Sequence, residues 1–198
     1  MLNFLRDTSG RFSYREAEGD HCIEFYRAGV ILEEETMTIP REKCETIKEL
    51  EPATGRYSED GETHPYATQY LEFSSPLWGK SVFEKIAKLG STREQVPKEW
   101  DYHILGSTGE LSSSGIHNRM IHKNGRYSIF QEWHHFHPFN EDESYYPSTT
   151  DQDKARANPA STCTIYSQGR RLEFGGMVPR KGYIDLKKFG NIWRTFAK

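Results

Sequence analysis

Alternating apolar and polar positions along this chain predict mostly β-strands. Residues 14–39 are rich in β-favouring side chains and are interrupted by turn-forming pairs at 19–20 and 28–29, which predicts two or three antiparallel strands. Residues 68–73 alternate in period two and predict another strand. Residues 106–115 are rich in Ser and Gly, so we expect a loop there. Further strands are predicted at 101–105, 162–166, 171–177 and 183–186.

Two segments have the pattern of a helix. In the first, Ser75 can cap the N-terminus, Pro76 suits the first helical position and Gly90 suits the C-terminal stop. The apolar stripe between them consists of Trp78, Val82, Phe83, Ile86 and Leu89. The second is shorter: it opens at Pro40 and places Cys44, Ile47 and Leu50 on one side before Pro52 ends it.

These elements predict one mainly β domain, a β-rich α+β fold spanning residues 1–198 with about two short helices. We expect its antiparallel sheet to curl into a lipocalin-like barrel, with an open sheet backed by helices as the alternative. Residues 139–160 contain two prolines, many acidic residues and few apolar ones, so they are predicted to form a mobile acidic loop.

Composition refines this expectation. Leu, Ile, Val and Phe make up 38 of the 198 residues, about 19%, but 26 aromatic residues and a net charge of only −3 favour a folded, aromatic-rich core. The chain has no apolar run of about 20 residues and no signal-peptide pattern, which predicts a cytoplasmic protein without a membrane partner. The three cysteines form no CxxC pair, and no glycine-rich phosphate loop is present.

Residues 116–137 contain five of the eight histidines and the Asn124-Gly125 pair, which is preferred in two-residue hairpin turns. A hairpin with this turn would pair Ile116 with Trp133 and Asn118 with Gln131. The predicted core face then carries Ile116, Asn118, Met120, His122, Tyr127, Ile129, Gln131, Trp133, His135 and His137. The opposite face carries His117, Arg119, Ile121, Phe130, Glu132, His134 and Phe136.

Polar residues in the middle of that core face indicate a pocket. Buried amides need partners, and a cavity holding a small organic molecule would supply them. We expect non-redox chemistry of lyase, isomerase or cyclase type that needs no cofactor. The expected catalytic residues are His122, His135 and Tyr127, and the expected ligand-binding residues are Asn118, Gln131, Trp133 and His137.

The segment His135-Phe136-His137, followed by Glu141, resembles the first half of the cupin metal motif, HxHxxxE. Cupins also need a later histidine, and this chain has none after His137, so we expect no tightly bound metal. A cupin-like metal enzyme is kept as an alternative. The same segment resembles the histidine pair of HUH nucleases, but Tyr183 and Lys187 have the wrong spacing for the tyrosine and lysine of that family. Solvated, inert histidines are the remaining interpretation.

The end of the chain is basic. From Gly169 onward eight basic residues stand against two acidic ones, which leaves +6 there and −9 in the rest. Four aromatic residues, Tyr183, Phe189, Trp193 and Phe196, are interleaved with these charges. The alternative function is therefore a non-catalytic interaction module that binds a protein or a single-stranded nucleic acid through this segment.

Overall fold

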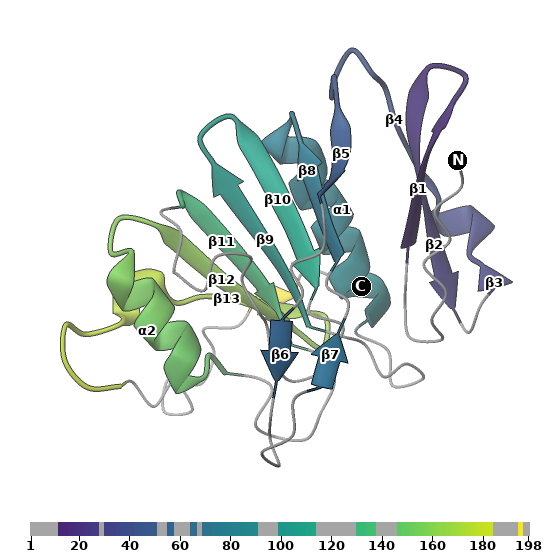
Figure 1. Ribbon diagram of the computed structural model, residues 1–198. Helices are drawn as coiled ribbons and strands as arrows, with labels where there is room; N and C mark the ends of the chain where they lie inside the picture. The colour runs from purple at the N-terminus through teal and green to yellow at the C-terminus, as the bar shows by residue number, and fades with distance from the viewer. Residues whose placement is uncertain are drawn as a thin grey trace.

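The computed structural model describes residues 12–27, 30–50, 55–57, 64–66, 69–90, 99–113, 130–137, 146–183 and 194–195. Its strands, drawn in Figure 1, are β1 (Phe12–Ala17), β2 (Asp20–Arg27), β3 (Val30–Ile31), β4 (Met37–Ile39), β5 (Ile47–Leu50), β6 (Gly55–Tyr57), β7 (His64–Tyr66), β8 (Gln69–Phe73), β9 (Trp100–Leu105), β10 (Thr108–Ser113), β11 (Glu132–Phe136), β12 (Thr162–Ser167), β13 (Arg170–Glu173) and β14 (Arg194–Thr195). The two α-helices are α1 (Pro76–Gly90) and α2 (Thr149–Ala157), and short 3-10 turns lie at Glu33–Glu35 and Gly175–Met177.

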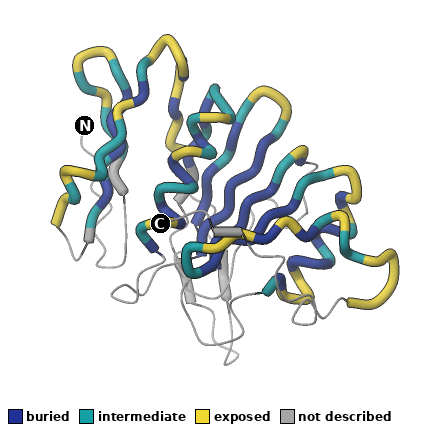
Figure 2. Tube along the Cα trace, turned by 180° about the vertical axis from the view of Figure 1, so that it is seen from behind, coloured by how far each residue is buried: buried dark blue, intermediate teal, exposed yellow. Residues whose placement is uncertain are grey.

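The main sheet has eight strands in the order β14-β13-β12-β11-β9-β10-β8-β5. All neighbours in it are antiparallel except β11 and β12, which run parallel and are connected through α2. Figure 2 shows its central strands as a continuous buried region. The mainly β class is thus confirmed. Within the described residues this sheet is an open path from β14 to β5, so a lipocalin-like closure is not confirmed.

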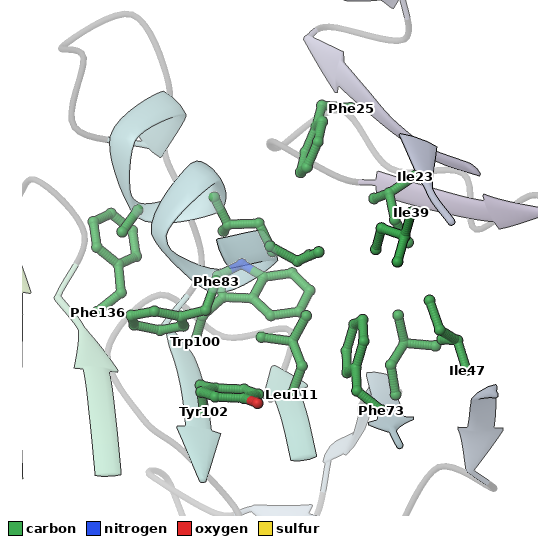
Figure 3. Packing of buried hydrophobic residues seen from close by; sticks show 14 of the residues in the cluster. Ile23, Phe25, Ile39, Ile47, Phe73, Phe83, Trp100, Tyr102, Leu111 and Phe136 are labelled. Atoms are coloured by element: carbon green, nitrogen blue, oxygen red, sulfur yellow. The ribbon is translucent and has the colours of Figure 1, made fainter. Parts of the chain in front are cut away.

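Each face of the main sheet packs against a different helix. On one face α1 covers a cluster that includes Phe83, Trp100, Tyr102, Leu111 and Phe136 (Figure 3). On the other face Ala155 of α2 belongs to a second cluster, whose remaining members are Phe130, Trp133, Cys163, Ile165, Leu172 and Phe174. The central strands β9, β11 and β12 are buried on both faces because each face of the sheet has a helix against it there.

Tyr102 determines how closely α1 approaches the sheet. Its side chain is fully buried, and its hydroxyl donates to the backbone oxygen of Pro76 at 2.6 Å. A Cβ built on Gly79 of α1 would lie 2.5 Å from the Tyr102 hydroxyl, and one built on Gly109 of β10 would lie 2.5 Å from its Cζ. Both glycines therefore provide the space that this ring occupies.

A smaller sheet is formed by β1, β2, β3 and β4, which confirms the antiparallel strands predicted for residues 14–39. Its buried residues Ile23, Phe25 and Ile39 belong to the cluster under α1, as Figure 3 shows. None of the helices in the described part of the chain is long and apolar enough to cross a membrane.

Helix α1 is confirmed with both predicted ends, but three other predictions are wrong. The short helix after Pro40 is instead a turn at 41–43 followed by β5, because Ile47–Leu50 pairs with β8. The loop predicted at 106–115 contains β10, whose small residues fit beneath α1. The acidic loop predicted at 139–160 contains α2 at Thr149–Ala157.

The predicted hairpin pairing of β11 is also wrong. Trp133 pairs with His103 of β9 on one side and with Cys163 of β12 on the other, so no edge of β11 is left for Ile116. Residues 114–129 lie outside the described residues. The predicted alternation is nevertheless right for this strand, because Trp133 and His135 stack on the α2 side while His134 contacts Phe83 of α1.

Candidate functional site

Acidic and imidazole side chains meet on the α2 side of the main sheet, where β9 begins and β11 ends. Strand β9 is antiparallel to β11, with Asp101 opposite His135. Alternation places Asp101 and Glu99 on the same face, and it does the same for His135 and His137. All four are buried, although charged side chains are rarely buried without partners. This register therefore concentrates four titratable groups in one small interior region.

Helix α2 adds a third element to this region. Its first turn begins with a reciprocal capping box, in which the Ser148 hydroxyl accepts from the Asp151 amide at 3.2 Å and the Asp151 carboxylate accepts from the Ser148 amide at 2.7 Å. The same carboxylate lies 3.3 Å from Nε2 of His137 and 3.8 Å from Nε2 of His135. The capping box thus holds the Asp151 carboxylate close to the imidazoles of both His135 and His137.

The carboxylate of Asp101 contacts three other side chains of the site. It is fully buried, and its Oδ1 accepts from the indole nitrogen of Trp133 at 2.8 Å and lies 2.6 Å from Nδ1 of His135. Its Oδ2 accepts from the ammonium group of Lys154 at 3.4 Å. The same ammonium lies 3.9 Å from the centre of the Trp133 ring, which adds a cation–π contact.

The charges of these groups shift one another's pKa values. Burial raises the pKa of Asp151, but the charges of His135 and His137 outweigh it and lower this pKa to about 2. Burial lowers the pKa of His135, yet the carboxylates of Asp101 and Asp151 raise it overall. Burial also lowers the pKa of Lys154, and Asp101 offsets this only in part. Such mutual shifts among buried groups are typical of functional sites.

Several donor atoms lie close enough together to share one metal ion. One ligand atom from each of Glu99, His135 and His137 lies within 4.8 Å of the others. The carboxylate of Asp151 approaches the same two imidazoles from α2. Two imidazoles and a carboxylate are a common ligand set for catalytic zinc, which leaves one position open for water or substrate. The site can therefore hold a divalent cation with a second carboxylate, Glu99, beside it.

A separate polar network lies on the opposite face of β11, under α1. Nε2 of His134 lies 2.9 Å from the Glu132 carboxylate, which also accepts from Lys80 at 2.8 Å. The Tyr166 hydroxyl lies 3.3 Å from Nδ1 of His134 and donates to Glu84 at 3.1 Å. This network connects α1 to β11 and β12 and is separated from the candidate metal site by the sheet.

Only part of the site predicted from the sequence comes together here. Trp133, His135 and His137 share one face as predicted, whereas Gln131 is exposed at a bend before β11. The other predicted residues, Asn118, His122 and Tyr127, lie outside the described residues, as does Glu141. The expectation that His135 and His137 bind no metal stays a prediction, and carboxylates of Glu99, Asp101 and Asp151 lie beside these imidazoles.

Sequence reasoning missed Glu99, Asp101, Asp151 and Lys154. One signal was available for α2: Ser148-Thr149-Thr150-Asp151 has the capping-box spacing of a helix start. A carboxylate that approaches the His135 and His137 pair was therefore visible as the capping acid of the next helix. Glu99 and Asp101 carry no local signal, because only the pairing of β9 with β11 brings them to the histidines.

Comparisons with known proteins add nothing to this geometry. No protein-family model matches the chain, and neither the curated proteins nor the solved structures include a match. The assignment of a function therefore depends on the side chains of the site alone.

Proposed function

We propose that this protein is a metal-dependent hydrolase that uses a single zinc ion. In this proposal His135, His137 and Asp151 are the metal ligands, and Glu99 is the general base. Two observations carry it: Glu99, just before β9, groups with His135 and His137 at the end of β11, and the Asp151 carboxylate of α2 approaches the same two imidazoles. A structural zinc site commonly uses four protein ligands, often cysteines, whereas the three described cysteines are free thiols and none of them belongs to the group formed by Glu99, His135 and His137.

The distances between the donor atoms fit a shared metal ion as well as they fit the direct hydrogen bond between His137 and Asp151. Ligands of a tetrahedral zinc ion lie about 2.0–2.1 Å from the metal and hence about 3.4 Å from one another. The Asp151 carboxylate lies 3.3 Å from Nε2 of His137 and 3.8 Å from Nε2 of His135. The first distance is close to the ligand spacing, and a small side-chain movement would bring the second to it.

The net charge of the site also supports a divalent cation. The buried carboxylates of Glu99, Asp101 and Asp151 carry three negative charges when ionised, and the buried ammonium of Lys154 offsets one of them. With neutral imidazoles the remaining charge is −2, and protonation of His135, whose pKa the carboxylates of Asp101 and Asp151 raise, offsets one more negative charge when no cation is bound. Unbalanced buried charge is costly, and a divalent ion would neutralise it.

The chemistry follows from this arrangement. Zinc in such a site acts as a Lewis acid and lowers the pKa of bound water. Glu99 takes a proton from the attacking water, whose oxygen adds to the substrate carbonyl carbon. Glu99 then delivers this proton to the leaving nitrogen or oxygen as its bond to that carbon breaks. An amide or ester plus water thus gives a carboxylic acid plus an amine or alcohol. One metal with one base suits carbonyl substrates, since phosphoryl hydrolases commonly use two metals.

The functions expected from the sequence stay predictions. The cofactor-free pocket depends mainly on Asn118, His122 and Tyr127, outside the described residues, and on a closed barrel. The interaction module depends on a basic segment of which residues 184–193 are likewise outside. The cupin-like alternative is the nearest of the three to the present proposal, with Asp151 and Glu99 as the acids in place of Glu141.

The test is metal binding followed by hydrolysis. Metal-free protein is titrated with zinc in competition with a chromophoric chelator, and is then assayed on a panel of amide and ester substrates. We expect one zinc ion per chain, and we expect His135→Gln, His137→Gln and Asp151→Asn each to weaken zinc binding strongly. Glu99→Gln should still bind zinc but lose hydrolysis, because only proton transfer is removed.

His134→Gln is the matched control, since it changes an equally buried imidazole of the same strand on the opposite face. It should bind zinc as the wild type does, with any loss of folding monitored by thermal melting. Wild-type zinc binding in His135→Gln and His137→Gln would contradict the proposed ligands. Stoichiometric iron with oxygen-dependent turnover would instead identify the other common use of two histidines and a carboxylate, a non-haem oxygenase.

A further inference from the structure

Asp101 has no direct role in the proposed reaction, but its side chain contacts groups of the candidate metal site. Asp101 lies behind His135, on the Nδ1 side of the ring, whereas the Asp151 carboxylate lies on the Nε2 side. The Asp101 carboxylate is fully buried, and protein groups approach both of its oxygens. Its effect on the site therefore passes through His135.

The identity of these partners determines the direction of each hydrogen bond. The indole nitrogen of Trp133 and the ammonium of Lys154 can only donate hydrogen bonds. They occupy Oδ1 and Oδ2 of Asp101 respectively, so both oxygens act as acceptors. The third contact, 2.6 Å between Oδ1 and Nδ1 of His135, then requires the imidazole to donate as well.

A neutral imidazole that carries its hydrogen on Nδ1 has its lone pair on Nε2. This is the nitrogen that faces Asp151 across the candidate metal position. If the hydrogen were on Nε2 instead, that nitrogen could not bind a metal. The tautomer of His135 thus decides whether the site is ready to take up the ion.

We propose that Asp101 is the positioning residue of the metal site: held by Trp133 and Lys154 as an acceptor, it fixes His135 in the tautomer whose Nε2 binds the metal. This inference rests on the proposed metal site. Lys154 contributes to this positioning. Its ammonium group donates to Oδ2 of Asp101 and so keeps that oxygen turned toward α2, the helix that also carries Asp151. The same helix therefore provides a metal ligand and helps to orient another.

Asp101→Asn is the informative variant, because it keeps the shape of the side chain and replaces one acceptor oxygen by an NH2 donor. Lys154 needs an acceptor, so the amide oxygen should turn toward it and leave the NH2 group facing Trp133 and His135. The ring of His135 would then accept at Nδ1 and carry its hydrogen on Nε2. We expect zinc affinity to fall by about 10- to 100-fold, the usual effect of losing such a partner.

Adding Lys154→Met to Asp101→Asn should restore binding. With the ammonium gone, the amide oxygen can turn back to the indole and the imidazole, and His135 can again donate from Nδ1. We expect the double variant to recover most of the lost zinc affinity. A residue with a merely structural role would not behave in this way, because a second buried substitution would then add to the damage. Asp153→Asn, on the same helix but paired with Arg156 and Tyr183 away from Asp101, is the control and should bind zinc normally.

Two measurements are made on the full chain: zinc affinity by chelator competition, and the His135 tautomer by long-range ¹H–¹⁵N NMR of metal-free protein at a pH where the ring is neutral. The wild type should show Nδ1–H, Asp101→Asn should show Nε2–H, and the double variant should return to Nδ1–H. A wild-type Nε2–H tautomer, or equal zinc affinity in wild type and Asp101→Asn, would overturn the inference.

The two proposals fail separately. If the wild type binds no zinc, the proposed function fails, while the NMR tautomer still tests the role of Asp101. If zinc binds and hydrolysis occurs but Asp101→Asn changes neither tautomer nor affinity, the proposed function stands and this inference is wrong. Should Asp101→Asn not fold, the tautomer of the wild type decides on its own.

Discussion

Gly109→Ala should destabilise the protein strongly, although alanine is normally better than glycine in a strand. The new Cβ would lie 2.5 Å from Cζ and 2.9 Å from Cε2 of Tyr102, far inside normal contact distance. Tyr102 has no room to retreat, because it is fully buried, packs 6.2 Å from the ring of Phe83 and donates to the Pro76 oxygen at 2.6 Å. Either the ring or helix α1 has to move.

The size of this effect follows from three contributions. Overpacking a core costs about 1–3 kcal/mol, and losing the buried hydrogen bond of the tyrosine hydroxyl costs about 1–3 kcal/mol more. Replacing glycine within a strand returns about 0.5–1 kcal/mol. The free energy of unfolding should therefore fall by about 1–5 kcal/mol, which lowers Tm by roughly 2–20 °C for a chain of this size.

The assay is urea or thermal unfolding of purified variants followed by circular dichroism. Gly176→Ala is the control, because a Cβ there meets no atom within 4 Å, and it should change stability by less than about 0.5 kcal/mol. Tyr102→Phe removes the hydroxyl oxygen, which is the atom nearest to the new methyl group. This substitution should therefore lower the free energy of unfolding less in the Gly109→Ala background than in the wild type. Wild-type stability of Gly109→Ala would show that α1 does not pack on Tyr102 in this way.

Two further predictions concern the neighbourhood of the site. Ser148→Ala removes the capping hydroxyl of α2, so it should lower the unfolding free energy by about 1 kcal/mol and weaken zinc binding through Asp151; a variant equal to wild type in both would count against the cap. Glu132 has its pKa lowered from 4.5 to about 2 by hydrogen bonds to His134 and Lys80, so its stabilisation is complete above pH 4.5 and is lost as the pH falls toward 2. Glu132→Gln should therefore be less stable than wild type at neutral pH, and acid titration of both should show this difference shrinking below pH 4.5.

Local signals in the sequence predicted the elements that depend on them. Helix α1 was predictable at both ends because Pro76 and Gly90 mark its limits and an apolar stripe lies between them. The shared face of Trp133, His135 and His137 was predictable because alternation along a strand needs no knowledge of its neighbours.

Other elements were missed because their signals are weak or depend on distant residues. Helix α2 buries Asp151, Gln152, Lys154 and Ala155, so the side facing the core is mostly polar and shows no apolar periodicity. Strand β10 contains Gly109, which looks like a loop residue until Tyr102 is known to occupy its space. A turn pair favours a hairpin locally, but it cannot reveal that β9 and β12 already occupy both edges of β11.

The parallel pairing of β11 with β12 has a consequence for the order of folding. The hairpin of β9 and β10 needs only the turn at Gly106 and Ser107, whereas Glu132 pairs with Thr162, thirty positions later and across a connection that contains α2. Closing a long connection lowers the conformational entropy of the chain before the contacts that offset this loss have formed, so such pairings form slowly. The histidines lie where this connection begins and Asp151 lies within it, in the first turn of α2, so we expect the metal position to assemble among the last parts of the protein. Zinc added during refolding would then act late, by trapping the completed crossover rather than by guiding the first strands together.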